Sequence, residues 1–106
     1  MTGYTGQQLE QALQEARLTD WQASPDGGLR ARYGTGDFMS GLELVQRIAA
    51  VAEDAGHHPD LLLTYPHVDV RLISHDVGTV TDRDLQLAQQ ISELAADAEI
   101  EVAPTD

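Results

Sequence analysis

The chain has no cysteine and no lysine, and it contains no long apolar run. Without cysteine there is no disulfide framework, no thiolate nucleophile and no cysteine-ligated zinc, which excludes several classes of enzyme. No window approaches the roughly 20 apolar residues that span a bilayer, and the N-terminal residues MTGYTGQQLE lack the basic and apolar regions of a signal peptide. We therefore expect a cytoplasmic protein that has no membrane partner.

Positive charge is also scarce. All six basic residues are arginine, against 18 acidic residues, and the formal net charge is -12. Such a surface repels phosphate backbones, so direct nucleic-acid binding is not expected. With 106 residues, 42% of them hydrophobic, the chain has the size and apolar content of one folded domain that spans residues 1–106.

Three segments have the period of amphipathic helices. The first follows Thr5 and Gln8, which have capping-box spacing, and ends near residue 18. The second runs from residue 38 to about 55, with Thr35 or Asp37 as its cap, and ends at Gly56. The third begins at a cap formed by Thr81 and Asp84. The predicted apolar faces are Leu9, Ala12, Leu13 and Ala16, then Phe38, Leu42, Val45, Ile48, Ala49 and Ala52, and finally Leu87, Ala88, Ile91, Leu94 and Ala95.

Two hairpins are predicted between these helices. One begins at Trp21 and turns at residues 25–28, and the other pairs residues 60–65 with 68–74. Strict alternation in the last strand directs Val68, Val70 and Leu72 to the core, and Asp69, Arg71, Ile73 and His75 to the other side. Residues 97–106 have no strong period and are expected to be extended or frayed.

The order of elements predicts an α+β fold, a four-stranded mainly antiparallel sheet with three helices packed on one face. One sheet face and the edge strands then lack cover within a single chain. Exposed edges are commonly paired or covered, so a homo-oligomer is expected.

All four histidines lie between Glu53 and Asp84, together with Tyr65. A histidine near its ordinary pKa of about 6.5 acts as an acid or a base at cellular pH, so His57, His58 and His75 around one pocket could transfer protons. Acid-base chemistry of this kind needs no cofactor.

Other interpretations of these residues stay open. Either member of the adjacent pair His57 and His58 can be a hydrogen-bonded turn residue, and Asp84 can be only a helix cap. A zinc or iron site could combine one of that pair with His75 and a carboxylate. Neighbouring residues rarely direct two imidazoles at one ion, and no helical H-x-x-x-H pair is present, so the spacing disfavours a metal.

The order Glu53, His57-His58-Pro59, Tyr65, His75 and Asp84 closely resembles the signature of the pterin-4a-carbinolamine dehydratases. The order of helices and strands, the position of Trp21 and the start of the last helix, residues 81–85, also resemble that family. The resemblance covers nearly the whole chain, from about residue 9 to 95.

The resemblance implies dehydration of 4a-hydroxytetrahydropterin to quinonoid dihydropterin, which recycles the pterin used by aromatic amino acid hydroxylases. It also implies assembly into dimers or tetramers through the sheet edge and helices. Animal members of the family act as dimerisation cofactors of a homeodomain transcription factor. A non-catalytic binding or assembly protein with the same fold is therefore the alternative.

The resemblance further implies that His57, His58 and His75 line the pterin pocket. Either His57 or His75 protonates the departing 4a-hydroxyl, while His58 orients the ring and helps to remove the N5 proton. His67 matches no position of the motif and is expected at the surface.

By the same resemblance, Asp84, with Arg83 and Glu53, orients or tunes the imidazoles. Two positions depart from the pattern, since many relatives have Asp or Asn where Gly56 stands and Trp where Leu61 stands. Neither change touches the three histidines, so activity is expected to survive.

Overall fold

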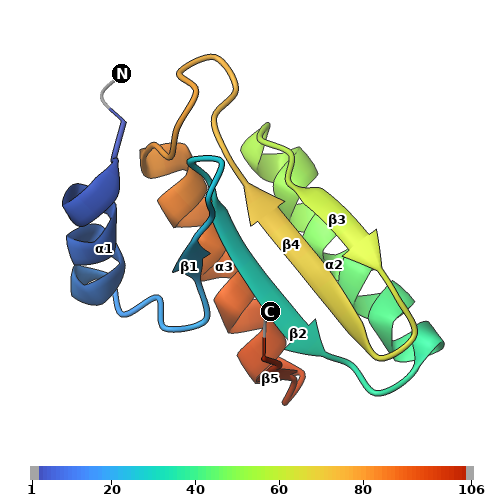
Figure 1. The fold of residues 1–106 in the computed structure, drawn as a ribbon. Coiled ribbons are helices and arrows are strands. Elements are labelled where there is room, and N and C mark those ends of the chain that lie inside the picture. The colour runs from blue at the N-terminus through green and yellow to red at the C-terminus, as the bar shows by residue number, and fades with distance from the viewer. Residues whose placement is uncertain (1–2, 105–106) are drawn as a thin grey trace.

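A computed structural model describes residues 3–104, which form three helices and five strands (Figure 1). The sheet is antiparallel, with the strand order β1-β2-β4-β3, and β5 pairs with β2 beyond the end of β1. The α+β fold is confirmed, and the fifth strand comes from the segment that was expected to be extended or frayed. In chain order the elements are α1 (Gly6–Glu15), β1 (Gln22–Ala23), β2 (Leu29–Gly34), α2 (Phe38–Ala55), β3 (Asp60–Leu63), β4 (His67–Leu72), α3 (Asp82–Asp97) and β5 (Glu101–Val102).

The core lies between the sheet and the helices. Val68, Val70 and Leu72 of β4 are buried as the alternation predicts, and every second residue of β2 joins them. Helices α2 and α3 pack against each other over this face, and α1 stands beyond the β1 edge (Figure 1). Full burial of a large apolar side chain is worth about 1.5–3 kcal/mol, so this cluster is the main source of stability.

The buried face of α2 differs from the prediction. Phe38 is 48% exposed and Ala49 is exposed, although both were expected to face the core. The reason lies at Gly41, where an added Cβ would stand 2.6 Å from Leu63 Cδ1. Because Gly41 has no side chain, the helix can approach the sheet closely at this point. The residues on the same side of the helix as Gly41 therefore face the core. The buried residues of α2 are Gly41, Leu44, Ile48 and Ala52.

The helix ends follow the predicted signals with one exception. Asp37 caps α2 by accepting a hydrogen bond from Ser40 N–H at 2.7 Å, and Gly56 ends it with a left-handed φ of 64°. Thr5 stands at the N-cap of α1, but its side chain makes no capping hydrogen bond, so the capping box predicted there is wrong. None of the helices in the described part of the chain is long and apolar enough to span a membrane.

The end of β4 also departs from the prediction. The strand stops at Leu72, and Ser74 forms an isolated bridge with Thr79 around a turn of residues 75–78. Ile73 was expected on the open face of the sheet, yet it is only 8% exposed. Strict alternation fails here because the chain leaves the sheet to form the turn. This turn, the C-terminus of α2 and the N-terminus of α3 lie at the same end of the sheet (Figure 1).

Candidate active site

His57 makes the shortest polar contact of the four histidines. Its backbone N–H donates to Ala52 O at 3.2 Å, which fixes the direction in which the chain leaves α2. Its Nε2 lies 2.5 Å from Asp84 Oδ1, and the two side chains are 12% and 0% exposed. A charge-assisted hydrogen bond removed from water in this way is stronger than one at the surface.

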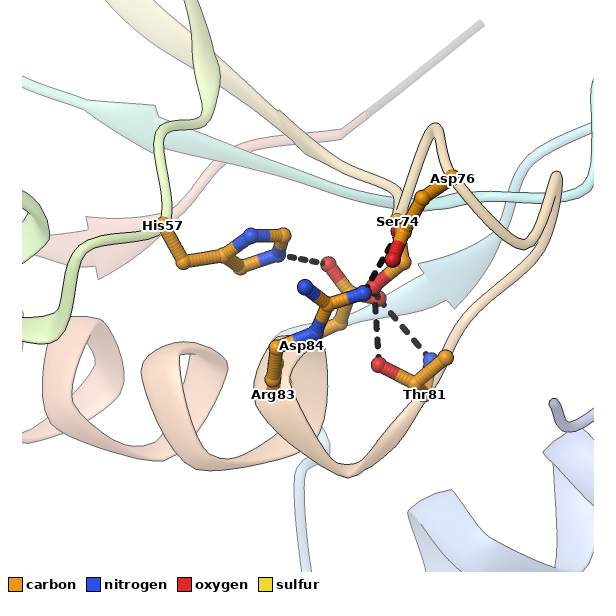
Figure 2. A network of polar contacts seen from close by, with 6 residues as sticks. All are labelled: His57, Ser74, Asp76, Thr81, Arg83 and Asp84. Atoms are coloured by element: carbon orange, nitrogen blue, oxygen red, sulfur yellow. Dashed lines mark hydrogen bonds and ion pairs between the residues drawn. The ribbon is translucent and has the colours of Figure 1, made fainter. Parts of the chain in front are cut away.

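Asp84 is the third residue of α3 and is completely buried. Its Oδ2 accepts hydrogen bonds from the Ser74 hydroxyl at 2.7 Å and from the Thr81 backbone N–H at 2.9 Å (Figure 2). A buried carboxylate needs such donors to offset the loss of water. Asp84 therefore closes the predicted capping box and holds an imidazole at the same time.

The hydrogen bonds of Asp84 determine which nitrogen of His57 is available for chemistry. The carboxylate accepts from Ser74 and Thr81, so we assign it as the acceptor from His57 Nε2–H as well. Nε2 then carries a hydrogen in both charge states, and Nδ1 is the atom that gains or loses a proton. Among the described residues, Asp84 is the only one that hydrogen-bonds the His57 side chain.

His58 points to a different carboxylate. Its Nε2 lies 2.6 Å from Glu53 Oε1 in the last turn of α2, and the side chains are 62% and 77% exposed. Solvent and salt screen a pair as open as this one, so it contributes little to stability. His58 is thus held next to His57 but remains accessible to a ligand.

His75 lies exposed in the turn of residues 75–78. Ser74 closes this turn, because its N–H donates to Thr79 O at 3.0 Å and its carbonyl accepts from Val77 N–H at 3.1 Å and from Gly78 N–H at 2.8 Å. Gly78 has a φ of 81°, a conformation that glycine adopts without steric cost.

Arg83 holds the same turn from the first turn of α3. Its Nη2 donates to Asp76 Oδ1 at 2.6 Å, and this hydrogen bond lowers the pKa of the Asp76 carboxyl below its ordinary value. In the described part of the chain, the ion-pair partner of Arg83 is this carboxylate and not an imidazole. Arg83 therefore contacts the turn that carries His75, at the residue next to the histidine.

The start of α3 brings two histidine-bearing segments together. Asp84 contacts His57 from the exit of α2, and the preceding residue, Arg83, contacts the residue that follows His75. Figure 2 shows His57, Asp84, Arg83 and Asp76 in one cluster with Ser74 and Thr81. Three segment ends, far apart in the sequence, thus converge at one place.

Two other residues of the region lie away from this cluster. His67 is the first residue of β4, at the opposite end of that strand from Ser74, and its Nε2 stands 3.6 Å from Asp69 Oδ2. Its side chain is 22% exposed, so it is more enclosed than the surface position expected for it. Tyr65 is 67% exposed in the connection between β3 and β4, also at that far end.

The histidines form no metal cluster with other described residues, and they do not line the hollow on the open face of the sheet. Within residues 3–104, no three His, Cys, Asp or Glu side chains come together as ligands for a metal ion. A hollow of about 370 Å³ lies on the sheet face that the helices leave open, and no histidine lines it. Its charged lining residues are Asp26, Arg30, Arg32, Asp60, Asp69 and Arg71.

Sequence reasoning missed Ser74 as a member of the cluster. The alternation that places Val68, Val70 and Leu72 inward also places Ser74 inward, where a hydroxyl needs a partner. Ser74 is 1% exposed, and its hydroxyl lies 2.8 Å from Thr81 Oγ1 as well as 2.7 Å from Asp84 Oδ2. A polar residue at a core-facing position was therefore the available signal.

Comparison with known proteins places the sequence in a family. The sequence model of the family described as pterin 4 alpha carbinolamine dehydratase matches residues 2–94. The chain belongs to this family. Proteins of the family from Nocardia farcinica and Thermosynechococcus vestitus, both provisionally named pterin-4-alpha-carbinolamine dehydratase, are each 42% identical to it. They align over 89 and 82 residues, covering 84% and 77% of this chain and 90% and 85% of the relatives.

A solved structure shares the fold. The crystal structure of a protein from Brucella melitensis named transcriptional coactivator/pterin dehydratase superimposes with a TM-score of 0.80 at 26% sequence identity. The match covers 89% of this chain and 99% of the other. The α+β sheet and its helices are therefore the fold of the dehydratase family.

Proposed function

We propose that the protein is a hydro-lyase that converts 4a-hydroxytetrahydropterin, the 4a-carbinolamine, to quinonoid dihydropterin and water. Membership of the family supports the substrate class. The single observation that carries the chemistry is the buried His57–Asp84 pair, which commits Nε2 of the imidazole and leaves Nδ1 for proton transfer.

The reaction is the loss of water across the C4a–N5 bond of the pterin. An imidazolium, of His57 or His75, donates a proton to the 4a-hydroxyl as the C4a–O bond breaks, and the oxygen leaves as water. The N5 lone pair forms the C4a=N5 double bond, and the N5 proton passes to a base. His58 orients the ring and helps to take that proton, since it is exposed and beside His57. All the groups required are side chains, so no cofactor takes part.

The roles of the carboxylates follow from their contacts. Asp84 orients His57 by a hydrogen bond from a carboxylate that has no contact with solvent. Glu53 orients His58 from the open end of α2, where the effect is weaker because both groups are solvated. Arg83 restrains the turn that bears His75.

The experiment is to generate 4a-hydroxytetrahydropterin in solution and to follow its dehydration optically with and without the protein. The wild type is expected to accelerate the step, and a variant with His57, His58 and His75 replaced by Ala is expected not to. Proton transfer by a positioned side chain typically contributes about 10²–10⁴-fold. A wild-type rate equal to the uncatalysed rate would refute the proposal.

We further propose that the protein works as a homo-oligomer, a dimer or a tetramer, in contact through the open β3 edge. β3 is the last strand in the sheet order, and among the described strands only β4 pairs with it. Leu62 of this strand is 58% exposed. An unpaired strand edge with an exposed apolar side chain favours pairing with another chain, so a second copy is the expected partner.

A non-catalytic binding or assembly protein that keeps the dehydratase fold is the second candidate. The name of the Brucella melitensis relative, which joins coactivator and dehydratase, favours keeping it. The test is to complement a cell that lacks the protein with the variant in which all three histidines are replaced. Full function of that variant would support assembly without catalysis, and loss of function supports the enzyme.

A further inference from the structure

Ser74 is a buried polar residue that the proposed chemistry does not use. It follows the last inward-facing residue of β4 by two positions and is 1% exposed. Its backbone closes the turn of residues 75–78 through three hydrogen bonds, one from its N–H and two to its carbonyl. It is also the residue immediately before His75, so whatever fixes Ser74 fixes the base of that turn.

The hydroxyl of Ser74 connects this turn to the other histidine. A serine has one hydroxyl hydrogen, and Ser74 donates it to Asp84 Oδ2 at 2.7 Å. The contact of 2.8 Å with Thr81 Oγ1 must then be donated by Thr81. The Ser74 hydroxyl thus accepts a hydrogen bond from the Thr81 hydroxyl at the start of α3. It donates one to the Asp84 carboxylate, which in turn contacts His57 (Figure 2).

The orientation of the Asp84 carboxylate depends on this bond. The terminal torsion of an aspartate has a broad energy minimum, so a single hydrogen bond leaves the plane of the carboxylate poorly fixed. The Thr81 N–H and the Ser74 hydroxyl reach Oδ2 from α3 and from β4, respectively. Together they hold Oδ2 in place and direct Oδ1 at His57 Nε2.

We propose that Ser74 is a positioning residue that couples His57 to His75. Its hydroxyl orients Asp84, and through Asp84 the imidazole of His57, while its backbone anchors the turn that bears His75. Because this assignment concerns the same site, it rests on the proposed function for its catalytic consequence. The geometric claim about the two imidazoles is independent of the reaction and can be measured without substrate.

Ser74→Ala is the direct test, because it removes the hydroxyl and adds no atoms to the core. In the wild type, NMR of the imidazole nitrogens should show His57 with its hydrogen on Nε2 and a downfield Nε2–H proton. In Ser74→Ala we expect this proton signal to weaken or shift. The side-chain signals of His75 should move with it, because the backbone of Ser74 is no longer held to Asp84 and Thr81 by the hydroxyl. His67, at the far end of β4, supplies the reference within the same spectrum and should not change.

The kinetic readout separates positioning from binding. The Ser74 side chain is directed at Asp84 and Thr81, so we expect KM to stay within about twofold while kcat falls about 10–100-fold, the loss that small misplacements of catalytic groups cause. Ser74→Thr keeps the hydroxyl and should restore most of kcat. If the extra methyl prevents folding, the NMR comparison of the wild type with Ser74→Ala still decides the question.

Ser92→Ala is the matched control. The Ser92 hydroxyl accepts a hydrogen bond from Trp21 Nε1 at 2.9 Å in the middle of α3, so its removal costs a comparable contact away from the histidines. Its kcat and its His57 signals should equal those of the wild type.

Two results would overturn the assignment. One is a folded Ser74→Ala protein with unchanged His57 and His75 signals, and the other is an equal loss of kcat in Ser92→Ala. If the wild type has no dehydratase activity but Ser74→Ala still shifts both histidines, the proposed function fails and the positioning role stands.

Discussion

At the scale of single residues, the central feature is the direction of the hydrogen bonds around Asp84. This carboxylate accepts from a backbone amide, a hydroxyl and an imidazole, and none of its surface reaches solvent. Three donors on one buried carboxylate make it a fixed acceptor. His57 Nε2 then has a permanent role as donor, which reserves Nδ1 for chemistry.

Asp84→Asn tests this assignment, because an amide replaces one acceptor oxygen by a donor. The Thr81 N–H continues to require an oxygen at the Oδ2 position, so the amide NH₂ must take the position that faces His57. Nε2 would then have to accept, and the ring hydrogen would move to Nδ1. We expect the nitrogen NMR spectrum to show the exchanged tautomer.

The same variant should lose at least about 100-fold in the dehydration rate, because the proton-transferring nitrogen is no longer available. Glu53→Gln is the matched control, since it makes the same chemical change at the exposed His58 pair. It should cost far less. An Asp84→Asn protein with the wild-type tautomer and rate would contradict the assignment.

The sequence predicted these residues unevenly. His57, His58, His75 and Asp84 were found because their types and order match a family motif, and the cap at Asp84 followed from local spacing. The contact between His57 and Asp84 joins residues 27 positions apart, so no local pattern could show it. The role of Ser74 depends on the same long-range packing.

At the scale of elements, the site depends on how α2 ends and on how the turn after β4 is held. Gly56 has a φ of 64°, and an added Cβ would meet nothing within 4 Å. The cost of replacing it is therefore backbone strain alone. Asp or Asn would fit this geometry better than other residues with a side chain, because they adopt the left-handed conformation more readily.

Gly56→Ala should therefore destabilise the protein by about 1 kcal/mol, and Gly56→Asn by less. Urea unfolding measures both values. Gly34→Ala serves as the control, because Gly34 does not have a positive φ and its added Cβ would meet only ordinary contacts, the nearest at 3.6 Å. Equal stability of the Ala and Asn variants at position 56 would show that the left-handed end is not required.

The pair of Arg83 and Asp76 gives the turn of residues 75–78 a dependence on pH. The hydrogen bond from Arg83 lowers the pKa of Asp76 below its ordinary value of 3.8. A lowered pKa means that the stabilisation is present above that ordinary value and is lost as the pH falls through the pKa of the folded state. The turn should therefore be rigid near neutral pH and loosen in acid.

Backbone ¹⁵N relaxation of residues 75–78 at pH 7 and in acid measures this change. Asp76→Asn at pH 7 should show the mobility of the acidic wild type, and Glu93→Gln, an exposed change elsewhere on α3, should not. The partners are partly exposed, so high salt should weaken the tether as well. A turn that is equally rigid under all these conditions would exclude the tether.

Elements were predicted well where the signal was local. The helix stop at Gly56, the cap at Asp37 and the alternation in β4 depend on neighbours in sequence, and all three are confirmed. The predicted face of α2 was right at Ile48 and Ala52 and wrong at Phe38 and Ala49. Gly41 sets how closely the helix approaches β3, and that long-range contact cannot be read from the periodicity of the helix.

At the scale of the whole molecule, the net charge and the unpaired strand edge of the sheet determine which partners the protein can bind. Four of the six arginines, Arg32, Arg47, Arg71 and Arg83, are paired with carboxylates. A chain with a formal charge of -12 and most of its cations paired presents little positive surface. The open β3 edge, in contrast, is suited to a second copy of the chain.

Leu62→Lys tests the assembly, because a lysine on an edge strand opposes pairing with another sheet. Light scattering coupled to size-exclusion chromatography should show a dimer or tetramer for the wild type and a smaller species for the variant. Val102→Lys is the control, since Val102 is 46% exposed on β5, which pairs with β2 and lies away from the β3 edge. A wild-type monomer, or equal dissociation of both variants, would refute the β3 contact.

The most direct test of the account compares four single variants in the dehydration of 4a-hydroxytetrahydropterin: His57→Ala, His58→Ala, His75→Ala and His67→Ala. The account predicts that each of the first three loses at least about tenfold in rate relative to the wild type, because each removes a group that touches the pterin. His67→Ala should keep the wild-type rate within about twofold, since His67 lies at the other end of β4. A loss at His67 equal to that at His57, or wild-type rates in all four variants, would contradict the assignment of the site.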